Sequence, residues 1–253
     1  MKDILKPTNL PEWILGTGGI GLLLRIWLLK AGTDDNGFLI STHPANILLW
    51  ILTAIVLGAL LLLTKDLIEA TKYPFNFPAS TLSGYGAYVA AAGIGICTII
   101  DLSVSTAPIE VVSCLLGLLA ALMLAYSGYC RGNGLQPPVL VHIAISLYLM
   151  VRLICLYRRW SSDPQLLDYC FPLLATVCLM LATYHRASFN ADFGKRRPYA
   201  FFSLSAIYFS CLSMTGWANI PFFLSTIVWM ATDLCSLIPM PGRSLFQFRQ
   251  GDD

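Results

Sequence analysis

The chain contains about eight apolar segments, each close to the length that crosses a lipid bilayer, with only short connections between them. An α-helix rises 1.5 Å per residue, so about 20 mostly apolar residues span the hydrocarbon core. Four of the segments, 45–63, 83–100, 111–129 and 199–216, contain no Asp, Glu, Lys, Arg or His. The sequence therefore predicts an all-α integral membrane protein made almost entirely of membrane-spanning helices.

The composition agrees with this class. Hydrophobic residues make up 57% of the chain and charged residues 12%, whereas about a quarter of the residues of a soluble domain are charged. The net charge of +2 gives no basis for nucleic-acid binding. The expected spans are 13–31, 45–63, 84–100, 109–129, 138–157, 167–184, 199–216 and 220–238.

The distribution of positive charge predicts the orientation. With eight spans, eleven Lys and Arg residues fall on the side that holds both chain ends, and three fall on the other side. The three are Lys30, Arg158 and Arg159. Loops rich in Lys and Arg stay in the cytoplasm. Both termini are therefore predicted to be cytoplasmic, in a multi-pass protein of the plasma membrane.

Two further features indicate contact with the lipid bilayer. A basic stretch between the sixth and seventh spans is expected to attract anionic lipid head groups, at about 1 kcal/mol for each basic residue. Its members are Arg186, Lys195, Arg196 and Arg197. The aromatic residues Tyr73, Phe75 and Phe77 precede the third span and are expected to lie in the interfacial belt.

The two halves of the chain resemble each other. Arg25 lies in the first span and Arg152 in the fifth, each about two turns before the outer end and each followed by a polar turn with an acid. We predict two four-helix units in the same orientation, a plan that recurs in transporters. The units are 1–130 and 138–240, with a linker at 131–137 and a cytoplasmic tail at 241–253. The alternative is that apolar helices are alike simply because their compositions are alike.

Arg25 and Arg152 are the first candidates for a ligand or ion-pair site. Each is expected about 8–9 Å from the outer end of its helix. They could extend their guanidinium groups to the membrane surface, as arginines at that depth commonly do. Alternatively, they face inward and bind either the acids Asp101, Glu110 and Asp168 or an anionic group between the two units.

Asp233 and His142 are the second pair of candidates. Asp233 is a carboxylate well inside the eighth predicted span, and His142 lies in the inner half of the fifth. A carboxylate within the membrane is rare enough to suggest function, and a His–Asp pair could relay protons or bind a cation. If the eighth helix is shorter, Asp233 marks the membrane interface instead. His142 alone is more typical of a histidine satisfied within the core.

Glycine-rich segments are interpreted as helix-packing surfaces. Residues 16–21 read G-T-G-G-I-G and match the dinucleotide-binding pattern, but no strand precedes them and they lie in an apolar span. Small residues allow two membrane helices to approach closely. The third predicted span is also rich in small residues, and we expect it to lie centrally in the bundle.

Motifs of catalysis and metal binding are missing from the sequence. No phosphate-binding loop and no H-E-x-x-H motif occurs, and the eight cysteines form no C-x-x-C pair. We therefore expect no enzyme activity, no cofactor and no metal site. The function that fits best is a carrier or permease for a small molecule or an ion. The alternative is a non-transporting sensor, scaffold or subunit of a membrane complex, and a membrane-protein partner or a homo-oligomer fits either.

Overall fold

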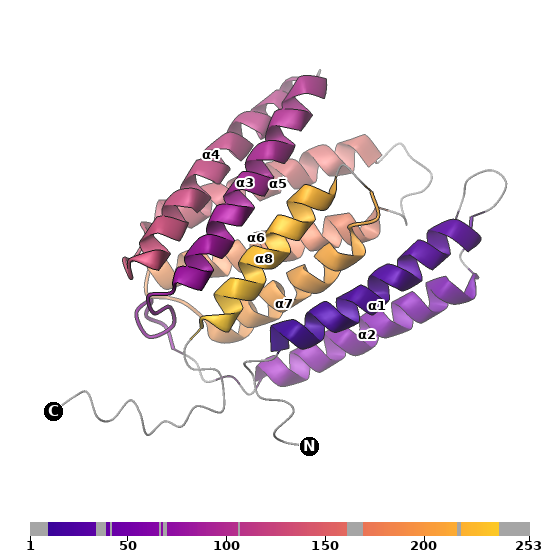
Figure 1. Ribbon diagram of the computed structural model, residues 1–253, viewed down its shortest axis with the longest axis horizontal. Helices are drawn as coiled ribbons and strands as arrows, with labels where there is room; N and C mark the ends of the chain where they lie inside the picture. The colour runs from indigo at the N-terminus through magenta and orange to yellow at the C-terminus, as the bar shows by residue number, and fades with distance from the viewer. Residues whose placement is uncertain are drawn as a thin grey trace.

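A computed structural model of the protein describes residues 10–33, 39–40, 42–65, 67, 70–105, 107–160, 169–216 and 219–237. Within these residues the chain forms eight α-helices (Figure 1). They are α1 (Leu10–Ala31), α2 (Pro44–Lys65), α3 (Thr81–Val104), α4 (Pro108–Gly132), α5 (Val139–Trp160), α6 (Cys170–Asn190), α7 (Arg196–Leu212) and α8 (Ile220–Cys235). The all-helical prediction is confirmed for this part of the chain.

Six of the helices, α1 to α6, are long and apolar enough to cross a membrane. At most half of the most apolar stretch of each is buried inside the protein, so large apolar surfaces face outward. On α2 the exposed side chains include Ile51, Ile55 and Leu62. Apolar surface of this extent is stable against lipid and marks a multi-pass membrane protein.

The predicted count of eight spans is not confirmed. α7 has 17 residues and begins with two arginines, and α8 has 16 residues. At 1.5 Å per residue these helices are about 24–26 Å long, shorter than the hydrocarbon core of a typical bilayer.

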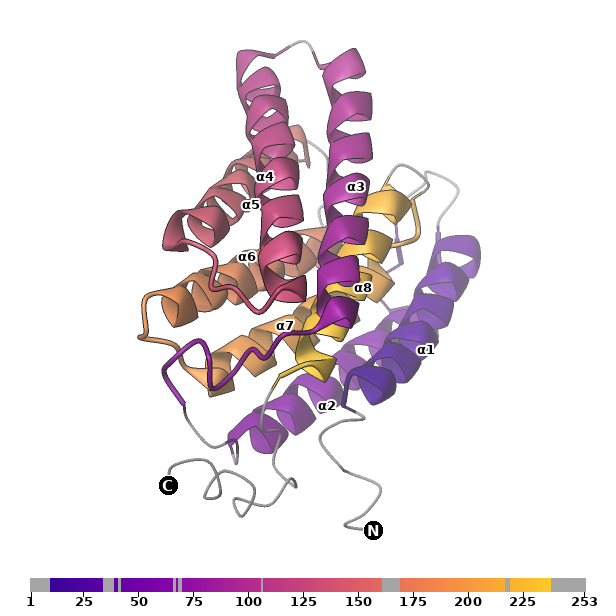
Figure 2. The same cartoon turned by 60° about the vertical axis from the view of Figure 1, so that its left-hand side comes forward.

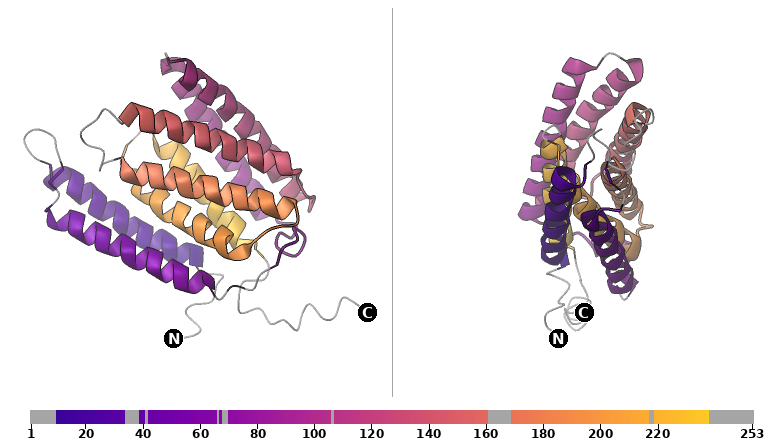
Figure 3. Two further views of the ribbon diagram at one scale, coloured as in Figure 1. Left: turned by 180° about the vertical axis from the view of Figure 1, so that it is seen from behind. Right: turned by 90° about the vertical axis from the view of Figure 1, so that its right-hand side faces the viewer.

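The helices form two layers, and α7 lies in one of them beside α6 and α2. In the side view of Figure 3, α1, α8 and α3 lie on one side and α2, α5 and α6 on the other. α7 contacts α1, α2, α6 and α8, and 13 of its residues are buried. Figure 2 shows α3 and α4 side by side at one edge of the molecule. The prediction that the third span is central is therefore wrong: α3 packs on α4 and α8 and exposes its other face.

Glycines mediate the closest helix contacts, as predicted. In α1, a Cβ atom added at Gly18 would lie 2.9 Å from Cβ of Cys211, so this glycine allows α1 to pack against α7. Gly93 of α3 packs against α8, where an added Cβ would lie 2.9 Å from the carbonyl oxygen of Pro221. Gly84 and Gly128 bring α3 and α4 together in the same way. Within the G-x-G-x-x-G pattern, Gly18 and Gly21 thus serve packing against α7, while Gly16 has no neighbour within 4 Å of an added Cβ.

The neighbours of corresponding helices differ between the two halves of the chain. α6 packs on α5 and α7, whereas α2, its counterpart in the proposed duplication, packs on α1 and on α7 of the other half. The two parallel four-helix units and their boundaries therefore stay a prediction.

The membrane orientation can be tested with two exposed positions. Lys195 lies between α6 and α7, and Arg158 lies in the last turn of α5. We expect a membrane-impermeant maleimide added outside intact cells to label the Arg158→Cys variant above the wild-type background and to leave Lys195→Cys unlabelled until the membrane is opened. Labelling of both variants from the same side would contradict the predicted topology.

Candidate functional site

A buried cluster of charges lies at the end of the bundle where α8 ends. Asp233 of α8 is 1% exposed and forms ion pairs with Arg186 of α6 and Arg131 of α4, the latter with 3.6 Å between Arg131 Nε and Asp233 Oδ1. Tyr199 of α7 donates a hydrogen bond to Asp233, and Ser83 of α3 donates another over 2.7 Å. Five helices therefore meet at one carboxylate.

The loop before α3 closes this charge cluster. The guanidinium carbons of Arg186 and Arg131 lie 4.0 and 5.0 Å from the ring centre of Phe77, which is buried with Tyr73. Arg131 also donates to the carbonyl of Pro78 and, over 2.7 Å, to Oγ of Ser236. The prediction of an interfacial aromatic belt is therefore wrong for Tyr73 and Phe77, because both are buried and the ring of Phe77 lies over two buried cations. Phe75 is exposed, as expected.

The basic stretch is divided between the interior and the surface. Arg186 and Arg196 are buried; Arg196 donates to Oδ1 of Asn76 and to the carbonyl of Phe75. The prediction that they face anionic lipid is wrong, because α6 continues to Asn190 and carries Arg186 into the bundle. Lys195 and Arg197 are exposed, and lipid contact stays a prediction for these two residues.

His142 belongs to a separate buried hydrogen-bond group. Its Nε2 lies 3.3 Å from Oγ of Ser127 and its Nδ1 lies 2.9 Å from Nδ2 of Asn190. The contacts of His142 thus differ from those of Asp233, whose charge is matched by two arginines. A direct His142–Asp233 pair is therefore not formed, although Asp233 does lie inside the bundle.

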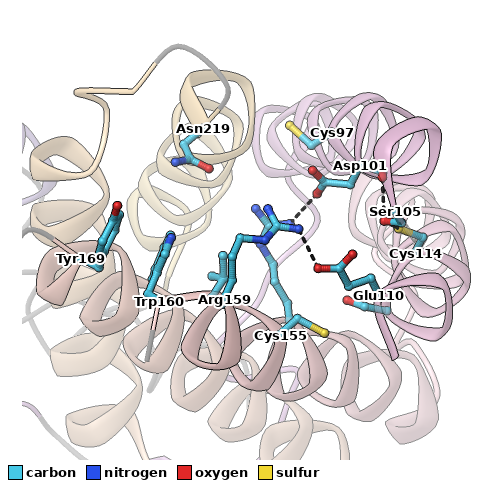
Figure 4. Close-up of a pocket in the computed structure, with 13 residues that line it drawn as sticks. Cys97, Asp101, Ser105, Glu110, Cys114, Cys155, Arg159, Trp160, Tyr169 and Asn219 are labelled. Atoms are coloured by element: carbon cyan, nitrogen blue, oxygen red, sulfur yellow. Dashed lines mark hydrogen bonds and ion pairs between the residues drawn. The ribbon is translucent and has the colours of Figure 1, made fainter. Parts of the chain in front are cut away.

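A polar cavity of about 250 Å³ lies at the opposite end of the bundle, among the C-terminal ends of α3 and α5, the start of α4 and the residues just before α6 and α8. Two ion pairs line the cavity. Arg152 Nη1 lies 3.2 Å from Asp101 Oδ2, and Arg159 Nη2 lies 2.9 Å from Glu110 Oε1. Figure 4 shows Asp101 and Glu110 directed toward the same space as Arg159, with Trp160 and Tyr169 to one side. The side chain of Asp101 is 44% exposed, so the cavity is open to the outside.

Arg152 is the most enclosed charge of this cavity. It is 9% exposed, and its guanidinium carbon lies 4.2 Å from the ring centre of Phe222 at the start of α8. Its Nη1 faces both Asp101 and the hydroxyl of Tyr148, but its Nε has no hydrogen-bond partner among the described residues. Of the predicted site residues, Arg152 and Asp101 are therefore together.

Arg25 also faces inward but lies elsewhere. Its Nη1 donates to the carbonyl of Leu212 over 2.8 Å, and its guanidinium carbon lies 5.0 Å from the ring centre of Phe171. Thus Arg25 belongs to the contact of α1 with α7 and α6, and it does not line the cavity that holds Arg152. The remaining predicted residue, Asp168, lies outside the described residues.

Apolar residues separate the charge cluster from the cavity. Along α3 the two are 18 residues apart, from Ser83 to Asp101, which is about 27 Å of helix. Ile94 of α3, Leu124 of α4 and Ile145 of α5 lie between these ends and are buried. A polar opening, an apolar layer and a closed charge cluster therefore follow one another along the bundle.

The described cysteines are all free thiols. Cys97, Cys114 and Cys155 line the cavity, and Cys235 is exposed. Within the described ranges, no group of three or more His, Cys, Asp or Glu side chains is placed to hold a metal ion. The interactions that the described residues form at both sites are ion pairs and hydrogen bonds.

Several site residues were not identified from the sequence. Arg131 falls in the predicted linker 131–137, Tyr199 is the first residue of the seventh predicted span, and Arg159 enters the sequence analysis only through the predicted orientation. One signal could have revealed them: an Asp within a membrane helix requires a cationic partner, and basic residues at the same end of the bundle are the available partners.

No protein-family model, no curated protein and no solved structure matches this chain.

Proposed function

We propose that this protein is a carrier that moves a small polar solute across the membrane. The observation that supports it is the charged cavity, which opens at one end of the bundle while an apolar layer and a buried charge cluster close the other. Charged side chains inside a membrane protein are expensive to bury and often line the path of a substrate.

The arrangement favours a carrier over a channel. A channel keeps a continuous polar path, whereas here Ile94, Leu124 and Ile145 interrupt the space between the cavity and Asp233. A carrier binds its solute from one side, closes over it and then opens to the other side. In this proposal the structure corresponds to the state that is open at the Arg152 end.

The contact between α3 and α8 is suited to such a change. Gly86 and Gly93 of α3 face Thr232 and Ser225 of α8 at close range, so the helices meet over small side chains. Small shifts between packed helices are one of the recurring forms of domain movement. α3 carries Asp101 at one end and Ser83 at the other, so a shift of α3 would alter both charged regions.

Uptake into proteoliposomes tests the carrier proposal. Purified protein is reconstituted and exposed to a panel of isotope-labelled solutes: amino acids, carboxylates, amines and sugars. We expect at least one solute to enter faster than into protein-free vesicles, and Arg152→Gln to reduce that rate at least tenfold because the enclosed cation of the cavity is lost.

The control is Lys65→Gln, which removes an exposed cation at the end of α2, outside both charged regions. Its uptake rate should equal that of the wild type. Folded, reconstituted protein that moves no member of the panel would overturn the proposal and favour a non-transporting role.

A further inference from the structure

We infer that the cavity at Arg152 is a binding site for a small zwitterion, with Arg152 holding its carboxylate and Asp101 its ammonium group. An α-amino acid with a small or medium side chain has this chemistry. Only the claim that this zwitterion is the transported solute rests on the proposed function. Binding of the zwitterion at the cavity can be measured without any transport.

The side chain of Arg152 requires a further acceptor. A guanidinium carries five N–H donors in a planar fork, and a carboxylate is the group that matches two of them at once. In Arg152, Nη1 is engaged with Asp101 and Tyr148, while Nε is buried and has no partner in the part of the chain that is described. A buried donor left unmatched is unfavourable, and an anionic oxygen that displaces the side chains covering Nε would satisfy it.

Asp101 provides the opposite charge beside it. Arg152 bonds to Oδ2 of Asp101, and a carboxylate has about four positions that accept hydrogen bonds. The side chain of Asp101 is 44% exposed toward the opening of the cavity, so an ammonium group can reach it from outside. Arg152 and Asp101 therefore present one cation and one anion to the same ligand, with 3.2 Å between Arg152 Nη1 and Asp101 Oδ2.

The rest of the lining favours a zwitterion over a simple anion. The second ion pair, Arg159 with Glu110, again places both signs at the cavity, so the four charges among the described lining residues sum to zero. A ligand with only a negative charge would approach two carboxylates, and a ligand with only a positive charge would approach two guanidiniums. Charge complementarity of this kind selects the ligand that carries both signs.

The size of the cavity and its aromatic side limit the ligand. Its volume of about 250 Å³ is below the range of roughly 300–1,000 Å³ found for pockets that hold drug-sized molecules. Trp160 and Tyr169 stack with their ring centres 4.3 Å apart and form an apolar side of the cavity. This surface is suited to the side chain of an amino acid, while the charges hold its backbone groups.

Calorimetric titration of the purified protein in lipid nanodiscs tests the inference. The probes are glycine, alanine and leucine, each compared with its deamino acid and with its decarboxylated amine. We expect at least one amino acid to bind at least tenfold more tightly than both of its fragments. Arg152→Gln and Asp101→Asn should each weaken that binding at least tenfold, with Lys65→Gln unchanged.

Arg152→Lys serves if Arg152→Gln does not fold, because it keeps the charge and removes the fork; it should bind more weakly than the wild type. Equal binding of an amino acid and its deamino acid, or no binding of any of the three amino acids, would overturn the inference. Amino-acid binding without uptake would contradict the carrier alone. Uptake of another class of solute, with no amino-acid binding, would contradict the zwitterion site alone.

Discussion

Replacing Asp233 with alanine should lower the free energy of unfolding by about 3–5 kcal/mol, the range found when one partner of a buried ion pair is removed. Asp233 is the carboxylate on which Arg131, Arg186, Tyr199 and Ser83 converge. Without the Asp233 carboxylate, two guanidinium groups would lie together over the ring of Phe77 with no negative charge to balance them. Unfolding by sodium dodecyl sulfate in mixed micelles, followed by circular dichroism, measures the change.

The matched control is Asp101→Ala, which removes a half-exposed carboxylate with one arginine partner. Because the carboxylate of Asp101 is already 44% exposed, its loss should lower the unfolding free energy by less than the loss of Asp233 does, even though its partner Arg152 is buried. Asp233→Asn separates charge from hydrogen bonding, since the amide retains an acceptor for Ser83 but not the negative charge. If Asp233→Ala unfolded at the same detergent fraction as the wild type, the charge cluster would not stabilise the fold.

Gly93→Val should be the most disruptive substitution on the α3–α8 contact. An added Cβ would lie against Ser225 and 2.9 Å from the carbonyl oxygen of Pro221, which belongs to the backbone and cannot rotate away. Overpacking of this kind typically lowers stability by about 1–3 kcal/mol, and the two further methyl groups of valine place this variant at the upper end. The same detergent titration provides the measurement.

Gly95→Ala is the control for this prediction, two residues further along the same helix. There an added Cβ meets only Ala121, at an ordinary contact distance of 3.9 Å. This variant should be neutral or slightly more stable, since alanine exceeds glycine in helix propensity by up to about 1 kcal/mol. Equal losses at both positions would indicate that helix flexibility, and not the contact with α8, sets the effect.

The helices were predictable because a single physical requirement dominates them. A segment such as 45–63 contains nothing that water would stabilise, and in lipid its backbone must form its own hydrogen bonds. The packing role of Gly18 followed from the same reasoning, since no strand precedes it. These inferences needed only local composition.

The partners of the charged residues were not predictable in this way. A hydropathy profile places the end of a membrane helix where polar residues begin. In the structure, however, α4 continues past Arg131 to Gly132, and α6 continues past Arg186 to Asn190. Both arginines remain helical because Asp233 satisfies them inside the protein. Which basic residue meets which acid depends on how distant helices pack, and that information is not present in any one segment.

The central position of α7 has a consequence for how the chain is assembled. Its segment contains Ser203, Ser205 and Ser210, all buried, and it would enter lipid poorly on its own. Synthesis runs from the N-terminus, so α1, α2 and α6 already exist when α7 emerges, and α8 follows to cover it. The most polar helix is thus made after three of the four helices that cover it.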